Sequence, residues 1–288
     1  MKKREIIEGV IKDYDFPNKG SFELDGKKVI VKGALPGQKV SCMVSKVRKD
    51  KAEARLLDVL ERSEIEDAVP PCPQFGICGG CAYQTMSYEH QLELKAGQVK
   101  KLLDGVIDSE THPYDWEGII GSPVTTAYRN KMEYSFGDEY KDGPLVLGLH
   151  KKNSMYDIVP VCNCVIVSED YNRIVSYTME FAREHGLSYH KKMQHVGLLR
   201  HLVLRQSKTN GGLLVNLVTS TDGLENLDLN AYVEGLLALP LGGTIVGILH
   251  TANDSLADAV VPEKVTLLYG RDYIEEEVLG LHFQISPF

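Results

Sequence analysis

The sequence lacks any stretch that is long and apolar enough to cross a membrane. No run of about 18 apolar residues occurs in the 288-residue chain, so a membrane-spanning helix is excluded. The first residues are charged and no apolar segment follows them, so they do not form a signal peptide. Internal repeats and low-complexity tracts are also absent. We therefore expect a cytoplasmic protein without membrane contacts, long enough for about two domains of ~100–200 residues each.

The chain also lacks the net positive charge that is typical of nucleic-acid-binding proteins. Its net charge is −8, but residues 1–62 hold 15 Lys and Arg against 10 Asp and Glu, whereas the remainder holds 17 against 30. Such asymmetry suggests a basic nucleic-acid-binding module joined to a different body. The ordinary charged surface of a small β-domain explains it equally well.

Residues 1–62 have the pattern of a small closed barrel. Asp25-Gly26 is a favoured hairpin turn, and apolar and polar residues alternate over residues 40–45, as in a half-buried strand. Short strands without a helix pattern predict an OB-like β-barrel. The Pro-, Gly- and Cys-rich residues 63–87 then predict a loop, before an apolar stripe at Leu92, Ala96, Val99 and Leu103 predicts a helix that ends near Gly105.

Residues 88–275 predict a central domain of mixed structure. Ser168 can cap a helix that ends at Gly186, with Tyr171, Ile174, Val175, Thr178 and Ala182 on its buried face. Strand-like runs cover residues 201–206, 213–219 and 244–250. We therefore predict an α+β fold, with the N-terminal barrel followed by a mixed domain whose sheet is antiparallel.

Three cysteines within ten residues are the most specific chemical feature. Cys72, Cys78 and Cys81 surround Gly79 and Gly80, and thiolates are the ligands of iron–sulfur clusters and of zinc. The glycines allow a tight turn that brings N–H groups close to sulfur. Zinc sites usually use two separated ligand pairs, so the spacing favours a cluster without excluding zinc. The fourth ligand would be Cys162 or Cys164, whereas Cys42 is expected to be a buried hydrophobe.

Several stretches resemble one known family. They are residues 33–40, 51–55, 72–92, 128–131, 197–202, 269–275 and 283–288, in order along the whole chain. They are similar to the TRAM-domain, [4Fe–4S]-containing uracil-C5 methyltransferases of 23S rRNA and tRNA. The resemblance implies a TRAM barrel over residues 1–62, a cluster loop over 63–87, a central RNA-binding domain over 88–275, and the start of a catalytic domain at 276–288.

The resemblance also implies cofactors and their residues. The [4Fe–4S] cluster would be held by Cys72, Cys78, Cys81 and Cys164, with Cys162 as the alternative fourth ligand and a departure from the family pattern. S-adenosylmethionine would bind a Rossmann-like domain that is expected to be absent from this chain, because neither a Gly-rich cofactor loop nor a nucleophile motif occurs. None of the six cysteines is then the methyl-transfer nucleophile, and the chain alone is expected to be inactive.

RNA is the partner that these patterns predict, with rRNA favoured over tRNA, and a monomer is expected. Basic side chains could neutralise its phosphates. The candidates are Lys39, Lys46, Arg48, Lys49, Lys51, Arg55, Arg129, Lys131 and Arg200. Two alternatives are a stand-alone RNA-binding protein without catalysis and a zinc-stabilised module.

Overall fold

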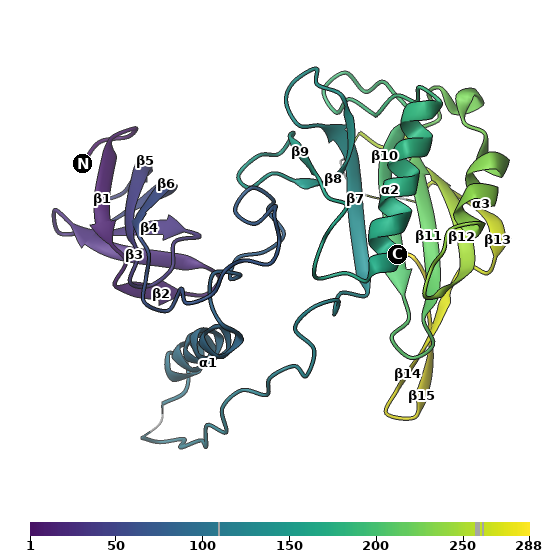
Figure 1. Ribbon diagram of the computed structural model, residues 1–288. Coiled ribbons are helices and arrows are strands. Elements are labelled where there is room, and N and C mark those ends of the chain that lie inside the picture. The colour runs from purple at the N-terminus through teal and green to yellow at the C-terminus, as the bar shows by residue number, and fades with distance from the viewer. Residues whose placement is uncertain (109, 257–259, 261) are drawn as a thin grey trace. The chain divides into compact units, whose positions relative to one another are not determined.

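The computed structural model describes residues 1–108, 110–256, 260 and 262–288 (Figure 1). Contacts divide the chain into two compact units: unit 1 contains residues 1–71 and 82–123, and unit 2 contains residues 72–81 and 124–288. These units cut across the predicted domains, because the helix at residues 88–104 groups with the N-terminal strands and the cysteine loop groups with unit 2. None of the described helices has the length and apolar character needed to cross a membrane.

Unit 1 is built on one six-stranded sheet. Its strands are β1 (Ile6–Val10), β2 (Asp13–Asp15), β3 (Lys19–Leu24), β4 (Lys27–Lys32), β5 (Lys39–Val47) and β6 (Lys51–Glu61), in the order β1-β5-β6-β4-β3-β2. The strands at the two ends of this order are neighbours in the chain. Asp25 and Gly26 join β3 to β4 with φ values of 52° and 68°. A tight hairpin needs positive φ at both positions, so the predicted turn is confirmed.

Helix α1 (Tyr88–Asp104) packs on the sheet of unit 1, but only in part with the predicted face. Leu94 contacts the buried cluster of Tyr14, Leu35 and Met86, and Gln98 is only 6% exposed. Val99, from the predicted apolar stripe, is 43% exposed. The other three members of that stripe are half-buried, so the predicted face is correct only in part. The buried face is therefore partly polar.

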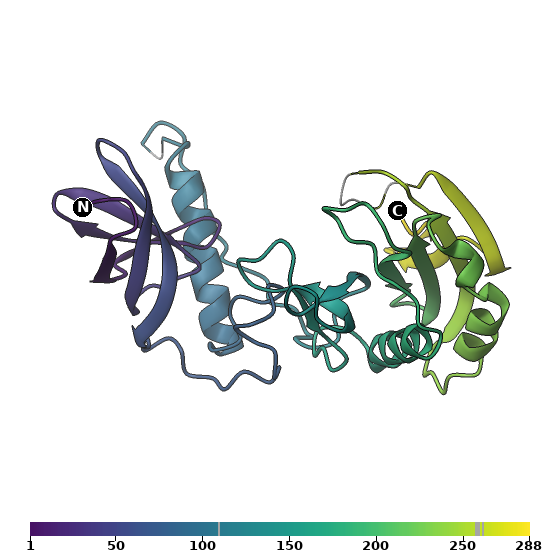
Figure 2. The same ribbon diagram turned by 90° about the horizontal axis from the view of Figure 1, so that it is seen from above.

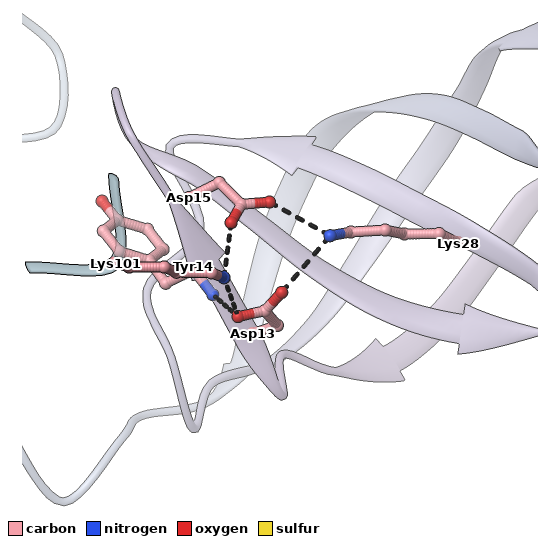
Figure 3. A network of polar contacts seen from close by, with 5 residues as sticks. All are labelled: Asp13, Tyr14, Asp15, Lys28 and Lys101. Atoms are coloured by element: carbon pink, nitrogen blue, oxygen red, sulfur yellow. Dashed lines mark hydrogen bonds and ion pairs between the residues drawn. The ribbon is translucent and has the colours of Figure 1, made fainter. Parts of the chain in front are cut away.

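Two lysines and two aspartates join α1 to this sheet (Figure 3). Lys101 Nζ, from α1, lies 2.6 Å from an oxygen of Asp13 and 2.6 Å from an oxygen of Asp15. Lys28 Nζ donates to the second oxygen of each carboxylate, at 3.3 and 3.0 Å. The hydrogen bond from Lys101 is the largest cause that lowers the pKa of both aspartates. The network therefore ties the last turn of α1 to β2.

Replacing Lys101 by alanine should weaken this connection. The side chains of Lys101, Asp13 and Asp15 are 36–49% exposed, so solvent screening limits the loss in free energy of unfolding to roughly 1 kcal/mol or less at pH ~7. Because the folded-state pKa values are lowered, the stabilisation is present above the unfolded value near 3.8 and disappears as the pH falls through the folded values. Urea unfolding of wild type and variant at pH ~7 and pH ~2.5 measures both effects.

Lys100→Ala is the matched control for this substitution. Lys100 lies next to Lys101 but pairs with Asp104 of the same helix, 2.7 Å away. Its loss should leave the contact between α1 and the sheet intact. Equal effects of the two variants at neutral pH would contradict a holding role for Lys101.

Unit 2 contains a seven-stranded sheet covered on one face by helices. Its strands are β7 (Lys131–Asp138), β8 (Leu145–His150), β9 (Ile158–Pro160), β10 (Leu199–Gln206), β11 (Gly212–Thr219), β12 (Thr244–Ala252) and β13 (Lys264–Gly270), in the order β13-β12-β11-β10-β7-β8-β9. Helices α2 (Glu169–Glu184) and α3 (Leu229–Leu237) lie side by side on this sheet, and a short 3-10 helix (Leu224–Asn226) precedes α3 (Figures 1 and 2). The hairpin of β14 (Ile274–Val278) and β15 (Leu281–Ile285) packs through Ile274 on Leu214 and Leu249, whose side chains are outside the helix-covered core.

Helix α2 follows its sequence pattern closely. The five predicted core residues are all buried, and Gly186 follows the helix with φ of 61°, the left-handed conformation expected after a helix end. Ser168 occupies the N-cap position, but its side chain makes no capping hydrogen bond. The apolar pattern therefore fixes this helix more strongly than its cap.

The fold class predicted for the central region is wrong. An antiparallel sheet without any Rossmann-like part was expected, but β11 and β12 pair in parallel from Gly212–Thr244 to Thr219–Ala252. Helix α3 lies between these strands in the chain. Such a β-α-β unit is the building element of Rossmann-like folds. The strand-like runs in the sequence predicted where the strands lie. They do not show whether neighbouring strands pair in parallel or antiparallel.

Candidate functional site

The cysteine loop is fixed to the end of strand β8. The Gly79 N–H donates to the carbonyl of His150 at 3.0 Å, and the Lys152 N–H donates to the carbonyl of Ile77 at 2.7 Å. Cys78 forms an antiparallel bridge with Lys151 between these bonds. A Cβ atom at Gly79 would lie 3.1 Å from the His150 oxygen, so this close approach favours glycine. The loop is therefore an extension of the sheet of unit 2.

Cys164 and two of the loop cysteines share the hydrophobic cluster of unit 2. Cys78 and Cys81 pack against the hydrophobic cluster of unit 2, to which the buried Cys164 belongs. Burial is the main cause that raises the pKa of the Cys164 thiol, and negative charge on Cys81 and Cys72 raises it further. Burial likewise raises the pKa of Cys78, with the same two thiols contributing. Cys72 and Cys81 thus act electrostatically on both Cys78 and Cys164.

Cys162 and Cys42 have different surroundings. Cys162 is exposed and borders a groove of about 380 Å³ that Glu169 and Arg173 also line. Cys42 is completely buried in the core of unit 1, and burial raises its pKa to about 11. The expectation that Cys42 is a buried hydrophobe is confirmed. Of the two candidates for a fourth ligand, Cys164 is the buried one, in the cluster against which Cys78 and Cys81 pack.

The donor set has the chemistry of an iron–sulfur site. Backbone N–H groups point at two of the sulfur atoms: Gly80 N lies 3.3 Å from Cys78 Sγ, and the amides of Ile166 and Val167 lower the pKa of Cys164 by hydrogen bonding. Such bonds tune the potential of cysteine-ligated clusters. Among the residues that the structure describes, no three His, Cys, Asp or Glu side chains are arranged as ligands of a metal ion. The thiols share a neighbourhood without forming a closed ligand cage.

Asn172 on helix α2 holds the backbone of Cys164. Its Oδ1 accepts the Cys164 N–H at 3.0 Å, and its Nδ2 donates to the Cys164 carbonyl at 3.5 Å. Asn172 is only 8% exposed. The sequence prediction missed this residue. The sequence feature that could have indicated it is a polar residue that stands between buried residues of the predicted helix.

Six predicted RNA-binding residues lie on β5, β6 and the turn between them. Lys46, Arg48, Lys49, Lys51 and Arg55 are exposed. Two of the six form ion pairs: Lys39 lies 3.1 Å from Glu61, and Arg48 lies 3.8 Å from Glu53. In the parallel pairing of β4 with β6, Lys28 is opposite Lys51 and Lys32 is opposite Arg55. Lys28 is already neutralised by Asp13 and Asp15, whereas the exposed side chains of Lys32 and Arg55 place two positive charges at opposed positions. This face of unit 1 is therefore suited to bind phosphates.

The predicted residues of unit 2 are less uniform. Arg129 is exposed and Lys131 is half-buried at the start of β7. Arg200 is only 4% exposed and donates to the carbonyls of Asn253 and Ser255 at 2.6 and 2.8 Å. A guanidinium in this position orders a loop of the protein. We therefore leave Arg200 out of the candidate RNA surface.

The chain resembles proteins named RNA methyltransferases over its whole length. It is 45% identical to an uncharacterized RNA methyltransferase of Clostridium acetobutylicum and 44% identical to another of Caldanaerobacter subterraneus, and it matches each over 100% of its own length. The chain spans 62% of the length of each of these relatives. No family model matches the sequence.

A solved structure shows the same fold. The tRNA (uracil-54, C5)-methyltransferase of Pyrococcus abyssi, in complex with S-adenosyl-L-homocysteine, superposes with a TM-score of 0.64 at 22% identity. The match covers 97% of this chain and 59% of that protein. Together with the parallel pairing of β11 and β12, this match contradicts the predicted fold class, an α+β fold with an antiparallel sheet and no Rossmann-like part. The comparisons do not support the expectation that the chain alone is inactive.

Replacing Asn172 by alanine should release the Cys164 backbone. Two buried peptide groups would lose their partners, so we expect the free energy of unfolding to fall by about 1–3 kcal/mol. The Cys164 thiol should also react faster with a thiol-specific reagent, as followed by mass spectrometry of the labelled peptide. Asn163→Ala, at an exposed neighbouring position, is the control and should change neither quantity. An unchanged labelling rate in Asn172→Ala would contradict the holding role.

Proposed function

We propose that this chain forms part of an RNA methyltransferase that uses S-adenosylmethionine and modifies C5 of a uridine. The observation that carries the proposal is the 45% identity to a protein named RNA methyltransferase over the whole of this chain. The uridine C5 target and the cofactor are supported by the structural neighbour, a uracil-C5 methyltransferase of tRNA in complex with S-adenosyl-L-homocysteine. We expect the protein to act in the cytoplasm as a monomer.

The part of the reaction that these residues serve is binding of the RNA. The opposed Lys32–Arg55 pair and the neighbouring Lys51 concentrate positive charge on one face of unit 1. Phosphates that bind there release counterions, so RNA affinity should fall steeply with salt. The finer proposals are that unit 1 contains a TRAM domain and that the RNA is ribosomal.

We further propose that Cys72, Cys78, Cys81 and Cys164 hold a [4Fe–4S] cluster. The support is that Cys78, Cys81 and Cys164 share one hydrophobic cluster, that charge on Cys72 acts on Cys164, and that backbone N–H groups are directed at sulfur. When bound, the cluster would supply a rigid inorganic cross-link between the cysteine loop and the segment before α2. The protein's own contribution is to place the four thiols through the bonds of Gly79 to β8 and of Asn172 to Cys164.

Deleting the coding sequence should remove one 5-methyluridine from cellular RNA. Methylation of C5 is a change of one methyl group per modified uridine, which nucleoside mass spectrometry of separated rRNA and tRNA detects. We expect the loss in rRNA, and restoring the gene should restore the nucleoside. A loss in tRNA alone would correct the RNA class, and an unchanged 5-methyluridine content in both would refute the proposed reaction.

Anaerobic purification should give a coloured protein with about four iron and four labile sulfide per chain. Cys164→Ser should lose the iron and its visible absorption, because this thiol is buried beside the loop cysteines. Cys162→Ser, at an exposed position two residues away, is the matched control and should keep both. A colourless wild-type protein with one zinc and no labile sulfide would support the zinc-stabilised alternative.

A further inference from the structure

We propose that a second RNA contact lies in unit 2, on two neighbouring loops that bind unpaired nucleotides. The lysine loops, residues 151–157 and 188–197, contain four lysines, two histidines and a single carboxylate, Asp157. This inference rests on the proposed function, because it takes RNA as the ligand. It adds a surface that is independent of the basic face of unit 1.

The two lysine loops are in direct contact. Tyr156 donates its hydroxyl to Met193 Sδ at 3.9 Å, and Lys192 Nζ donates to the Met155 carbonyl at 3.4 Å. Both contacts join residues that are 37 positions apart in the chain. The lysine loops therefore present one continuous surface.

Large apolar side chains are unusually exposed on this surface. Met155 is 77% exposed, Met193 71% and Tyr156 57%. Bases of single-stranded RNA stack on aromatic rings, and polarisable thioethers adapt to flat apolar partners. A duplex conceals the faces of its bases, so this surface suits unpaired nucleotides.

The charge of the lysine loops contrasts with the rest of unit 2. Unit 2 carries 14 Lys and Arg against 20 Asp and Glu, and the lysine loops hold four of those basic residues and one of the acidic residues. Asp157 lies 3.9 Å from Lys151, and Asp142 lies 3.5 Å from Lys191. The side chain of Lys152 is exposed. Positive charge concentrated in an otherwise acidic unit favours a polyanion over a protein partner.

Both loops are held in shape before any ligand binds. In the first, the Lys151 N–H donates to the Asp157 carbonyl at 2.9 Å, and Ser154 Oγ accepts the Tyr156 and Asp157 N–H groups at 3.3 and 3.1 Å. In the second, Lys191 pairs with Val196 around a tight turn. A preformed surface loses little conformational freedom on binding, so its exposed side chains can contribute most of their contact energy to affinity.

The test is fluorescence anisotropy of the full chain with a labelled 12-nucleotide oligouridine (a length of the order of one single-strand site) at several salt concentrations. Tyr156→Ala should weaken binding about 5- to 150-fold, because one base loses its stacking partner. Tyr156→Phe keeps the ring and should bind within about twofold of wild type. The double variant Lys152→Ala, Lys192→Ala should lower the slope of log affinity against log salt by roughly 1.4.

Controls distinguish this inference from the proposed function. Lys264→Ala removes an exposed lysine of unit 2 on β13, outside the lysine loops, and should leave affinity and salt slope unchanged. If wild type binds with salt dependence but Tyr156→Ala and the double lysine variant bind equally well, the lysine loops are not an RNA contact. If wild type binds no RNA at low salt, the proposed RNA function itself fails. An equal-length duplex that competes as well as the single strand would overturn the preference for unpaired nucleotides.

Discussion

The burial of helix α2 against the seven-stranded sheet is the interaction on which the candidate site depends. Tyr171 and Ile174 are completely buried in this contact, so the helix has little freedom to shift. Its first turns carry Asn172, which fixes Cys164. The position of Cys164 thus depends on apolar packing of α2, which does not itself contact a ligand. Packing of the core comes first, and the chemistry of the site follows from it.

The elements that could be predicted from the sequence are those with strong local signals. Helix α2 followed from its apolar spacing, and the β3–β4 turn followed from Asp25-Gly26, whose backbone requirement only a few residues meet. The buried face of α1 was predicted only in part, because Asp13 and Asp15, the partners of Lys101, lie on another segment of the chain. The parallel pairing of β11 and β12 likewise depends on tertiary structure rather than on the strands themselves.

The candidate site shows the same division. Three cysteines were found by their density in the sequence, and Cys164 was distinguished from Cys162 by the family resemblance. The structure supplies a physical distinction, since one thiol is buried among the others and the second faces a separate groove. Arg200 shows the opposite outcome. A sequence does not show whether a charged side chain is exposed, and here the hydrogen bonds of Arg200 to the carbonyls of Asn253 and Ser255 reveal that it orders a loop.

Two backbone hydrogen bonds join the cysteine loop to residues 150–152. They connect a group of thiols with a loop that carries basic side chains. On one side are thiols that can be oxidised or ligated, and on the other is the loop that carries Lys151 and Lys152. Thermodynamic coupling between two sites is reciprocal. If occupation of the thiols steadies the lysine-bearing loop and so tightens its hold on an anion, the bound anion must strengthen the occupation of the thiols by the same factor. Any ligand of the thiols would then dissociate most readily while the lysine-bearing loop holds no anion.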